Sequence, residues 1–355
     1  MKYDIFAPLD RRNLYLTGLS VILILLLWLT FVQPVFALTI SPVRMEISGD
    51  PGQTLQGELE LLNEQKESKT FYSSAQNFEA RGESGAPYFL PDTSKGLASW
   101  IKVQESVTLK PDERKTIPFS IEIPRNTEPA GYFAAILWGT SPPQTQGGGE
   151  VTIGGKLGVL ILLSVSGETQ EGGGLLEFKT EGGKFLTSLP ITFNYRFSND
   201  GSQRARPEGR LKVKNIFGGT SAMLSANSSL GNILPKSIRK FEVVWKTKSQ
   251  DDFDEFAKVK QQYIKNTEEE KVEGFFGAVR NEWKNFAFGL YKAELDLTYG
   301  QEQKTAEAQF RFFVFPWHLL SIIIFIFALL GIGGWFGLKK YNRWIIKKAQ
   351  SGKFQ

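Results

Sequence analysis

The 355-residue sequence contains no cysteine and a single histidine, His318. Without cysteine the chain has neither disulfides nor thiolate metal ligands. Because His318 lies at the edge of a long apolar run, Ser-His triads, Cys-His dyads and nearly all zinc sites are excluded. We therefore expect no metal and no cofactor, and an exported region that is held together by ordinary hydrophobic cores.

An excess of charge of one sign is also absent from most of the chain. The formal net charge is +5. Much of it comes from the C-terminal tail, which has no acidic residue and carries Lys339, Lys340, Arg343, Lys347, Lys348 and Lys353. The remainder is nearly neutral, so the sequence indicates no basic cleft for phosphate, and we expect no nucleic-acid partner.

One of two apolar runs lies near the N-terminus. Arg11 and Arg12 precede the run from Leu14 to Val32, and Val35 and Ala37 then supply the small-residue pattern of a signal-peptidase site. We predict that residues 1–37 are a signal peptide that is cleaved between Ala37 and Leu38. Because the run is long for a signal peptide, an uncleaved signal anchor is the alternative.

The other apolar run follows Phe315 and predicts a transmembrane helix over residues 316–338. Trp317 at one end and Trp335 with Tyr341 at the other are typical of residues that anchor a helix at the membrane interface. By the positive-inside rule, the basic tail of residues 339–355 is cytoplasmic and residues 38–315 lie outside the cytoplasm. The chain is thus predicted to be a single-pass membrane protein.

Short alternating strands with turn signals between them fill residues 38–168. Residues Leu55–Leu61 and Ile117–Ile123 alternate, and Pro124 follows the second of these strands. Five further strands are predicted at Thr39–Ile47, Thr70–Phe78, Trp100–Val103, Tyr132–Trp138 and Leu157–Val165. A total of about seven strands is typical of an immunoglobulin-like sandwich.

The β pattern restarts after the glycine-rich joint Gly167–Gly174 and continues to residue 315. Alternating residues predict strands at Ile191–Phe197, Leu211–Val213 and Arg239–Trp245, and two more lie at Tyr291–Leu297 and Ala306–Val314. The predicted fold class is therefore mainly β. It comprises two tandem immunoglobulin-like β-sandwiches, over residues 38–168 and 169–315, with a helical insertion in the second and a C-terminal transmembrane helix.

Residues 251–285 break the β pattern. Apolar residues recur there at steps of three and four, for example at Phe276, Val279 and Trp283, which predicts a helical hairpin. This insertion either packs across the second sandwich or contacts a partner or a membrane surface. Phe276 and Trp283 are the candidate partner-binding residues, because the insertion is expected to contribute fewer side chains to the core than the strands do.

Ser237 and Lys240 form the S-x-x-K spacing of serine acyl-transferases. That chemistry needs both residues on one face of a helix, whereas the alternation after Pro235 predicts a strand, on which positions i and i+3 face opposite ways. The surrounding segment, Leu234 to Trp245, also echoes Leu109 to Ile123 in the order leucine, proline, Arg-Lys and alternating apolar residues. We therefore interpret Ser237 as part of the architecture and assign no catalytic residue.

Several short motifs, each of low specificity, together make the chain resemble the bacterial cell-surface family of WxL-interacting proteins. They are S-P-V-R-M-E-I, S-W-I-K-V at Trp100, L-K-P-D-E-R-K, G-Y-F-A-A-I-L, P-E-G-R-L-K-V and I-L-P-K-S-I-R-K-F, followed by a single span with a basic tail. The resemblance implies two immunoglobulin-like domains, the first associated with peptidoglycan and the second with a host or partner protein. The insertion at 251–285 departs from that pattern, which leaves the second domain's partner open.

Three functional hypotheses follow from these patterns. The first is a non-enzymatic, membrane-anchored surface protein that binds cell-wall or surface-protein partners. The alternative is a periplasmic chaperone-like module that binds partner strands, since the first sandwich is also similar to pilus-chaperone sandwiches, whose edge strands receive a partner strand. The third is a Ser-Lys acyl-transferase, which would need Ser237 and Lys240 to converge on a cleft.

Overall fold

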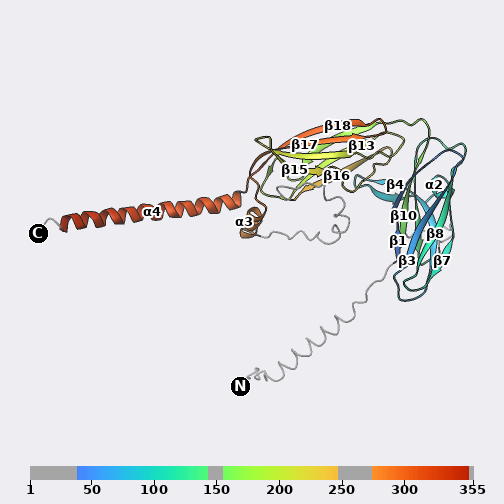
Figure 1. Cartoon of the computed structure of the whole chain (residues 1–355), viewed down its shortest axis with the longest axis horizontal. Coiled ribbons are helices and arrows are strands. Elements are labelled where there is room, and N and C mark those ends of the chain that lie inside the picture. The colour runs from blue at the N-terminus through green and yellow to red at the C-terminus, as the bar shows by residue number, and fades with distance from the viewer. Residues whose placement is uncertain (1–37, 143–154, 247–273, 352–355) are drawn as a thin grey trace, which may run out of the picture.

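The structure, a computed structural model, describes residues 38–142, 155–246 and 274–351. These residues are mainly β and form four sheets, followed by one long apolar helix. Two sheets belong to residues 38–168, called the first half below, and two belong to residues 169–315, called the second half. Figure 1 shows that the long helix leaves the second half at the end remote from the first half.

The first half contains one four-stranded and one six-stranded sheet. In the smaller sheet the strand order is β1 (Leu38–Ser41), β3 (Thr54–Asn63), β8 (Arg114–Glu122) and β6 (Ile101–Val103). In the larger sheet it is β2 (Arg44–Gly49), β10 (Leu157–Val165), β9 (Gly131–Gly139), β4 (Lys69–Arg81) and β5 (Ala86–Phe89), with β7 (Ser106–Leu109) also paired to β4. A short helix, α2 (Leu97–Trp100), precedes β6.

Both sheets of the first half turn apolar side chains into one shared core. On β8, Ile117, Phe119 and Ile121 are buried, while Pro118 and Glu122 between and after them are exposed. This period of two is what a strand with one solvated face requires. Buried side chains of β4, β9 and β10 complete the same cluster from the opposite sheet.

The segment predicted as one strand at Thr39–Ile47 is instead two strands in two different sheets. β1 pairs antiparallel with β3, whereas β2 pairs parallel with β10. Pro42 lies in the break between them and has no backbone N–H to continue a ladder. The prediction was also wrong to begin a strand at Trp100, which ends α2, and it omitted β5 and β7.

The second half contains a three-stranded and a five-stranded sheet. The smaller has the order β11 (Gly173–Thr180), β13 (Ile191–Asn199) and β16 (Ser237–Trp245). The larger has the order β12 (Phe185–Leu186), β18 (Lys304–Val314), β17 (Gly289–Tyr299), β14 (Glu208–Asn215) and β15 (Thr220–Ser225).

Aromatic side chains dominate the core of the second half. Phe193 and Trp245 of the smaller sheet are fully buried and meet Phe312 of the larger sheet, with ring centroids 5.5 and 6.5 Å away. Tyr195 stacks on Phe241 at 4.8 Å, and its buried hydroxyl donates to the Ala226 carbonyl oxygen at 3.0 Å. The hydroxyl is therefore satisfied where burial would otherwise penalise it.

Two helices complete the described chain: α3 (Phe275–Lys284) and α4 (Trp317–Ser351). α4 contains an apolar stretch long enough to cross a membrane, as the sequence predicted for residues 316–338. It does not end at Leu338 but continues through the basic tail to Ser351. Neither proline nor glycine occurs from Leu338 to Ser351, so nothing in that segment interrupts the helix.

Two predictions fall partly outside the described residues. The signal segment of residues 1–37, including Ala37, lies outside them, and Leu38 on the other side of the predicted cleavage point begins β1. Of the predicted insertion at 251–285, only α3 and its flanking residues from 274 onward are described. Cleavage after Ala37 and the domain boundary at residue 168 remain predictions.

The buried aromatic core predicts that alanine substitutions at two phenylalanines of the second half change the free energy of unfolding by very different amounts. Phe193→Ala removes a fully buried ring and should lower the free energy of unfolding by about 3–5 kcal/mol. Phe185→Ala, at a largely exposed position, should change it by less than about 0.5 kcal/mol. Urea unfolding of the detergent-solubilised chain measures both, and equal effects would contradict this assignment of the core.

Candidate functional site

A half-buried carboxylate joins the two halves of the molecule. Glu46 lies on β2, the outermost strand of its sheet, and faces the second half. Asn232 donates to its Oε1 at 2.8 Å, and the Arg206 guanidinium donates to both of its oxygens. Arg204 lies 3.6 Å from Oε2. The Glu46 side chain of the first half thus contacts three polar side chains of the second half, those of Asn232, Arg206 and Arg204.

Burial and neighbouring positive charges shift the pKa of Glu46 in opposite directions. Desolvation is the largest single influence and raises the pKa of its carboxyl group, but the Asn232 hydrogen bond and the charges of Arg206, Arg204 and Arg44 together lower it below the ordinary value. Glu46 is therefore ionised at neutral pH. Since a desolvated ion pair contributes little net stability, its main effect is to fix how the halves meet.

A second contact places the turn between β4 and β5 of the first half on β16 of the second half. The backbone N–H of Lys240 donates to the Glu83 carbonyl oxygen at 2.8 Å. The Arg196 Nε donates to the Glu83 carboxylate, also at 2.8 Å, and this hydrogen bond is the main cause of the lowered pKa of Glu83. Among the described residues, the backbone of the turn therefore hydrogen-bonds to the outer edge of β16 only at Lys240.

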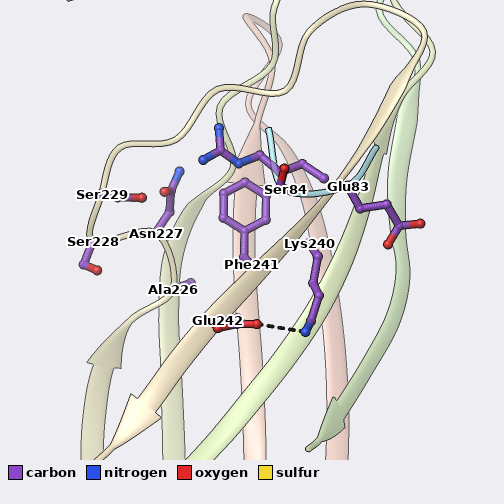
Figure 2. A pocket seen from close by; sticks show the side chains of 10 residues that line it. Glu83, Ser84, Ala226, Asn227, Ser228, Ser229, Lys240, Phe241 and Glu242 are labelled. Atoms are coloured by element: carbon purple, nitrogen blue, oxygen red, sulfur yellow. Dashed lines mark hydrogen bonds and ion pairs between the residues drawn. The ribbon is translucent and has the colours of Figure 1, made fainter. Parts of the chain in front are cut away.

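Beside this contact lies a cleft of about 530 Å³ that both halves line. Figure 2 shows Asn227, Ser228 and Ser229 on one side of the cleft and Glu83 on the other, with Phe241 between them. Arg239 also lines it, and its guanidinium lies 5.3 Å from the centre of the Phe241 ring and donates to the Asn232 carbonyl oxygen at 2.7 Å. The lining of the cleft thus combines an aromatic ring with side chains of positive and negative charge.

The outer edge of β16 runs along this cleft. In the antiparallel ladder with β13, the N–H of Lys240 points away from β13, so the N–H groups of Glu242 and Val244 point the same way. β16 is the last strand of its sheet among the described residues. Unpaired backbone groups along such an edge are a template for another strand.

The structure does not bring Ser237 and Lys240 together as an acyl-transferase would require. Both lie on β16, as the alternation predicted. The Ser237 hydroxyl donates to the Leu234 carbonyl oxygen at 2.7 Å, while the Lys240 ammonium donates to Glu242 at 2.8 Å. Each side chain is engaged in a contact that the other does not share.

Phe276 and Trp283, the candidate partner-binding residues, lie on α3 far from this cleft. They are 79% and 71% exposed, so they do not pack the helix onto the sheets. The buried side chain of α3 is Glu282. Local sequence does not single out Glu282, Glu46 or Glu83, because it does not show that a partner distant in the chain buries or pairs them.

No family model matches the chain, and no curated protein matches it. Solved structures that are similar to parts of it include two chaperones and one chaperone complex. The class 5 fimbriae chaperone CfaA has 13% identity and a TM-score of 0.34, with 78% of this chain and 98% of that chain covered. The YadV chaperone has 11% identity and a TM-score of 0.31, with 77% and 98% covered.

The third is the chaperone–tip subunit pre-assembly complex CsuC–CsuE of Acinetobacter baumannii, with 10% identity, a TM-score of 0.31, and 61% and 99% covered. Because all three TM-scores are below 0.5, these similarities establish neither a fold family nor an activity for this chain. The resemblance to WxL-interacting proteins remains a prediction.

The Glu46 contact predicts a stability change in acid. A carboxyl group whose pKa is lowered by folding stabilises the folded state above its unfolded value of 4.5 and loses that contribution as the pH falls through the folded pKa. Glu46→Gln should lower the free energy of unfolding by about 1–3 kcal/mol near neutral pH, because it leaves Arg206 and Arg204 without their counter-ion. Below about pH 4 the difference from the unmodified chain should shrink.

Urea unfolding at both pH values measures this effect, with Glu122→Gln on the exposed face of β8 as the matched control. A Glu46→Gln effect of the same size at both pH values would contradict the assigned ion pair.

Proposed function

We propose that the chain is a non-enzymatic, membrane-anchored binding protein that receives an extended segment of a partner protein on the outer edge of β16. The observation that carries this proposal is that no described strand pairs with the outer edge of β16, which runs beside the cleft between the halves. Strand addition of this kind uses backbone hydrogen bonds for affinity and side-chain pockets for specificity. The cleft at Phe241 and Arg239 is such a pocket.

The sheet topology supports two tandem immunoglobulin-like domains. In each half the third strand pairs with a later one, β3 with β8 and β13 with β16. In each half a short early strand also pairs parallel with the last strand, β2 with β10 and β12 with β18. The resulting order of both sheets in the first half follows the immunoglobulin pattern.

Among the described residues, the two halves differ in the strand beside this edge. β8 and β16 carry the two copies of the sequence echo and occupy equivalent places. In the first half β6 pairs with the outer edge of β8, from Ile101 opposite Ile121 to Val103 opposite Phe119. No described strand of the second half takes the corresponding place beside β16. A partner strand would therefore complete the sheet.

The edge position favours the chaperone-like mode of binding over a scaffold that uses only sandwich faces. In the first half the apolar strand β10 is paired with β2 from Leu160 to Val165, so most of its edge is already used. The open edge that we assign to the partner therefore lies in the second half. Peptidoglycan binding by residues 38–168 rests on the family resemblance alone.

The apolar helix α4 supports membrane anchoring. The stretch Trp317–Lys348 comprises 32 residues and is almost entirely uncovered by the rest of the molecule. Soluble proteins do not expose an apolar surface of that size. We propose that it spans the membrane once, with residues 38–315 outside the cytoplasm.

Strand addition predicts that a backbone change on β16 abolishes partner binding. A photo-crosslinking residue at Ser228 should yield a discrete adduct with another protein in native membranes. Glu242→Pro should abolish that adduct, because it removes an outward N–H at an edge position where proline is tolerated. Glu242→Ala, which keeps the N–H, should retain the adduct. Equal adduct yields in the two variants would contradict the proposal that the partner binds through backbone hydrogen bonds to β16.

The proposed topology predicts one-sided labelling of introduced cysteines, since the natural sequence has none. Cysteine at position Ser106 should react with a membrane-impermeant thiol reagent in intact cells, while cysteine at Ser351 should react only after the membrane is permeabilised. The reverse pattern would show that the orientation is inverted.

A further inference from the structure

Exposed aromatic side chains gather at one end of the five-stranded sheet. Phe185 of β12 lies opposite Phe313, Gly289 at the start of β17 lies opposite Val314, and Asn215 at the end of β14 lies opposite Tyr291. This register puts β12, the β14–β15 turn, the α3–β17 connection and the β18–α4 connection at the same end. The exposed residues there, called the aromatic platform below, are Phe185, Phe217, Phe276, Trp283, Phe288 and Trp317.

The platform has no counterpart at the opposite end of the same sheet. The β17–β18 turn there is formed by Gly300, Gln301, Glu302 and Gln303, which are polar or without a side chain. By contrast, Phe217 at the tip of the β14–β15 turn is 94% exposed and Phe185 is 80% exposed. Rings so fully exposed contribute little to the core, and their concentration at one end indicates a surface to which they dock.

A buried carboxylate fixes α3 to the first turn of α4. Glu282 is only 1% exposed, and its Oε2 accepts the backbone N–H of Leu319 at 2.7 Å. Its Oε1 lies 2.6 Å from Nδ1 of His318. A carboxylate at this position satisfies a free N–H of the helix start and is favoured by the helix dipole. The platform residues on α3 are therefore held beside the start of α4, as Figure 1 shows.

The length of α4 determines the depth at which its first turn lies. Residues Leu319 to Leu338 carry no charged side chain, and Lys339 begins the basic segment. They match the roughly 20 residues that a helix needs to cross the hydrocarbon core. With Leu338 at one boundary of that core, Leu319 lies at the other, so Trp317 and the contacting α3 lie in the interfacial zone. Trp and amphipathic helices are enriched in that zone.

We propose that the aromatic platform lies on the bilayer surface, in the interfacial zone of the membrane that α4 spans. This inference rests on the proposed membrane anchor and adds a second contact to it. The occupant is the lipid surface, because the platform is continuous with the start of the spanning helix. With both contacts, the second half is held against the membrane, and its opposite end, at the junction with the first half, points away.

The experiment uses the full-length chain in vesicles of phosphatidylcholine and phosphatidylglycerol. Single cysteines at Phe217 and Trp283 are labelled with an environment-sensitive fluorophore. A cysteine at Gln301 is the matched control on the polar end, and one at Leu330 reports the span itself. Quenching by dissolved iodide measures contact with water, and quenching by nitroxide-bearing lipid measures contact with the bilayer. Circular dichroism confirms that each variant is folded.

We expect the labels at Phe217 and Trp283 to be quenched by nitroxide lipid and protected from iodide, relative to Gln301. If those two labels match Gln301 while Leu330 is quenched by lipid, the platform proposal is wrong and the anchor stands. The platform would then be assigned to a protein partner. If the Leu330 label is open to iodide, the proposed anchor itself fails, and the platform with it.

Discussion

The relative placement of the two halves depends on the ion pairs that Glu46 and Glu83 of the first half make with arginines of the second. Each half closes its own hydrophobic core, and the two clusters share no residue. Charged contacts of this kind give geometry more than stability, since desolvation offsets much of the attraction. The cleft beside β16 forms where Glu83 holds the β4–β5 turn at Lys240, and no other described strand pairs with that edge.

A buried carboxylate also makes a polar contact at the end of the molecule from which α4 leaves. There the Glu282 carboxylate is almost fully buried and binds the first turn of α4 through the N–H of Leu319. An apolar residue at position 282 would leave this N–H with one partner fewer. Glu46 thus contributes to the placement of the two halves, and Glu282 to the placement of α3 at the start of α4.

Local patterns in the sequence predicted many of the strands, but neither β5, β7, β11, β12 and β15 nor the contacts that join the strands. Alternation placed β8 and β16, an apolar run of strand length placed β10, and the long apolar run placed α4, because each signal lies within the segment concerned. The division of Thr39–Ile47 between two sheets depends on pairing with β3 and β10, far along the chain. The three-residue steps in α3 indicated a helix but not its orientation, which Glu282 decides through His318 and Leu319.

Ser237 and Lys240 have an enzyme-like spacing without enzyme-like geometry, because they belong to a turn and strand that the first half repeats without the serine. Lys240 lies on the solvated face of β16, opposite the face that buries Phe241, Val243 and Trp245, and an alternating strand needs a polar residue there. The two strands also differ in their neighbours among the described residues. β8 is paired with β6 from Phe119 to Ile121, whereas β16 has one backbone hydrogen bond to the first half, from the N–H of Lys240 to Glu83.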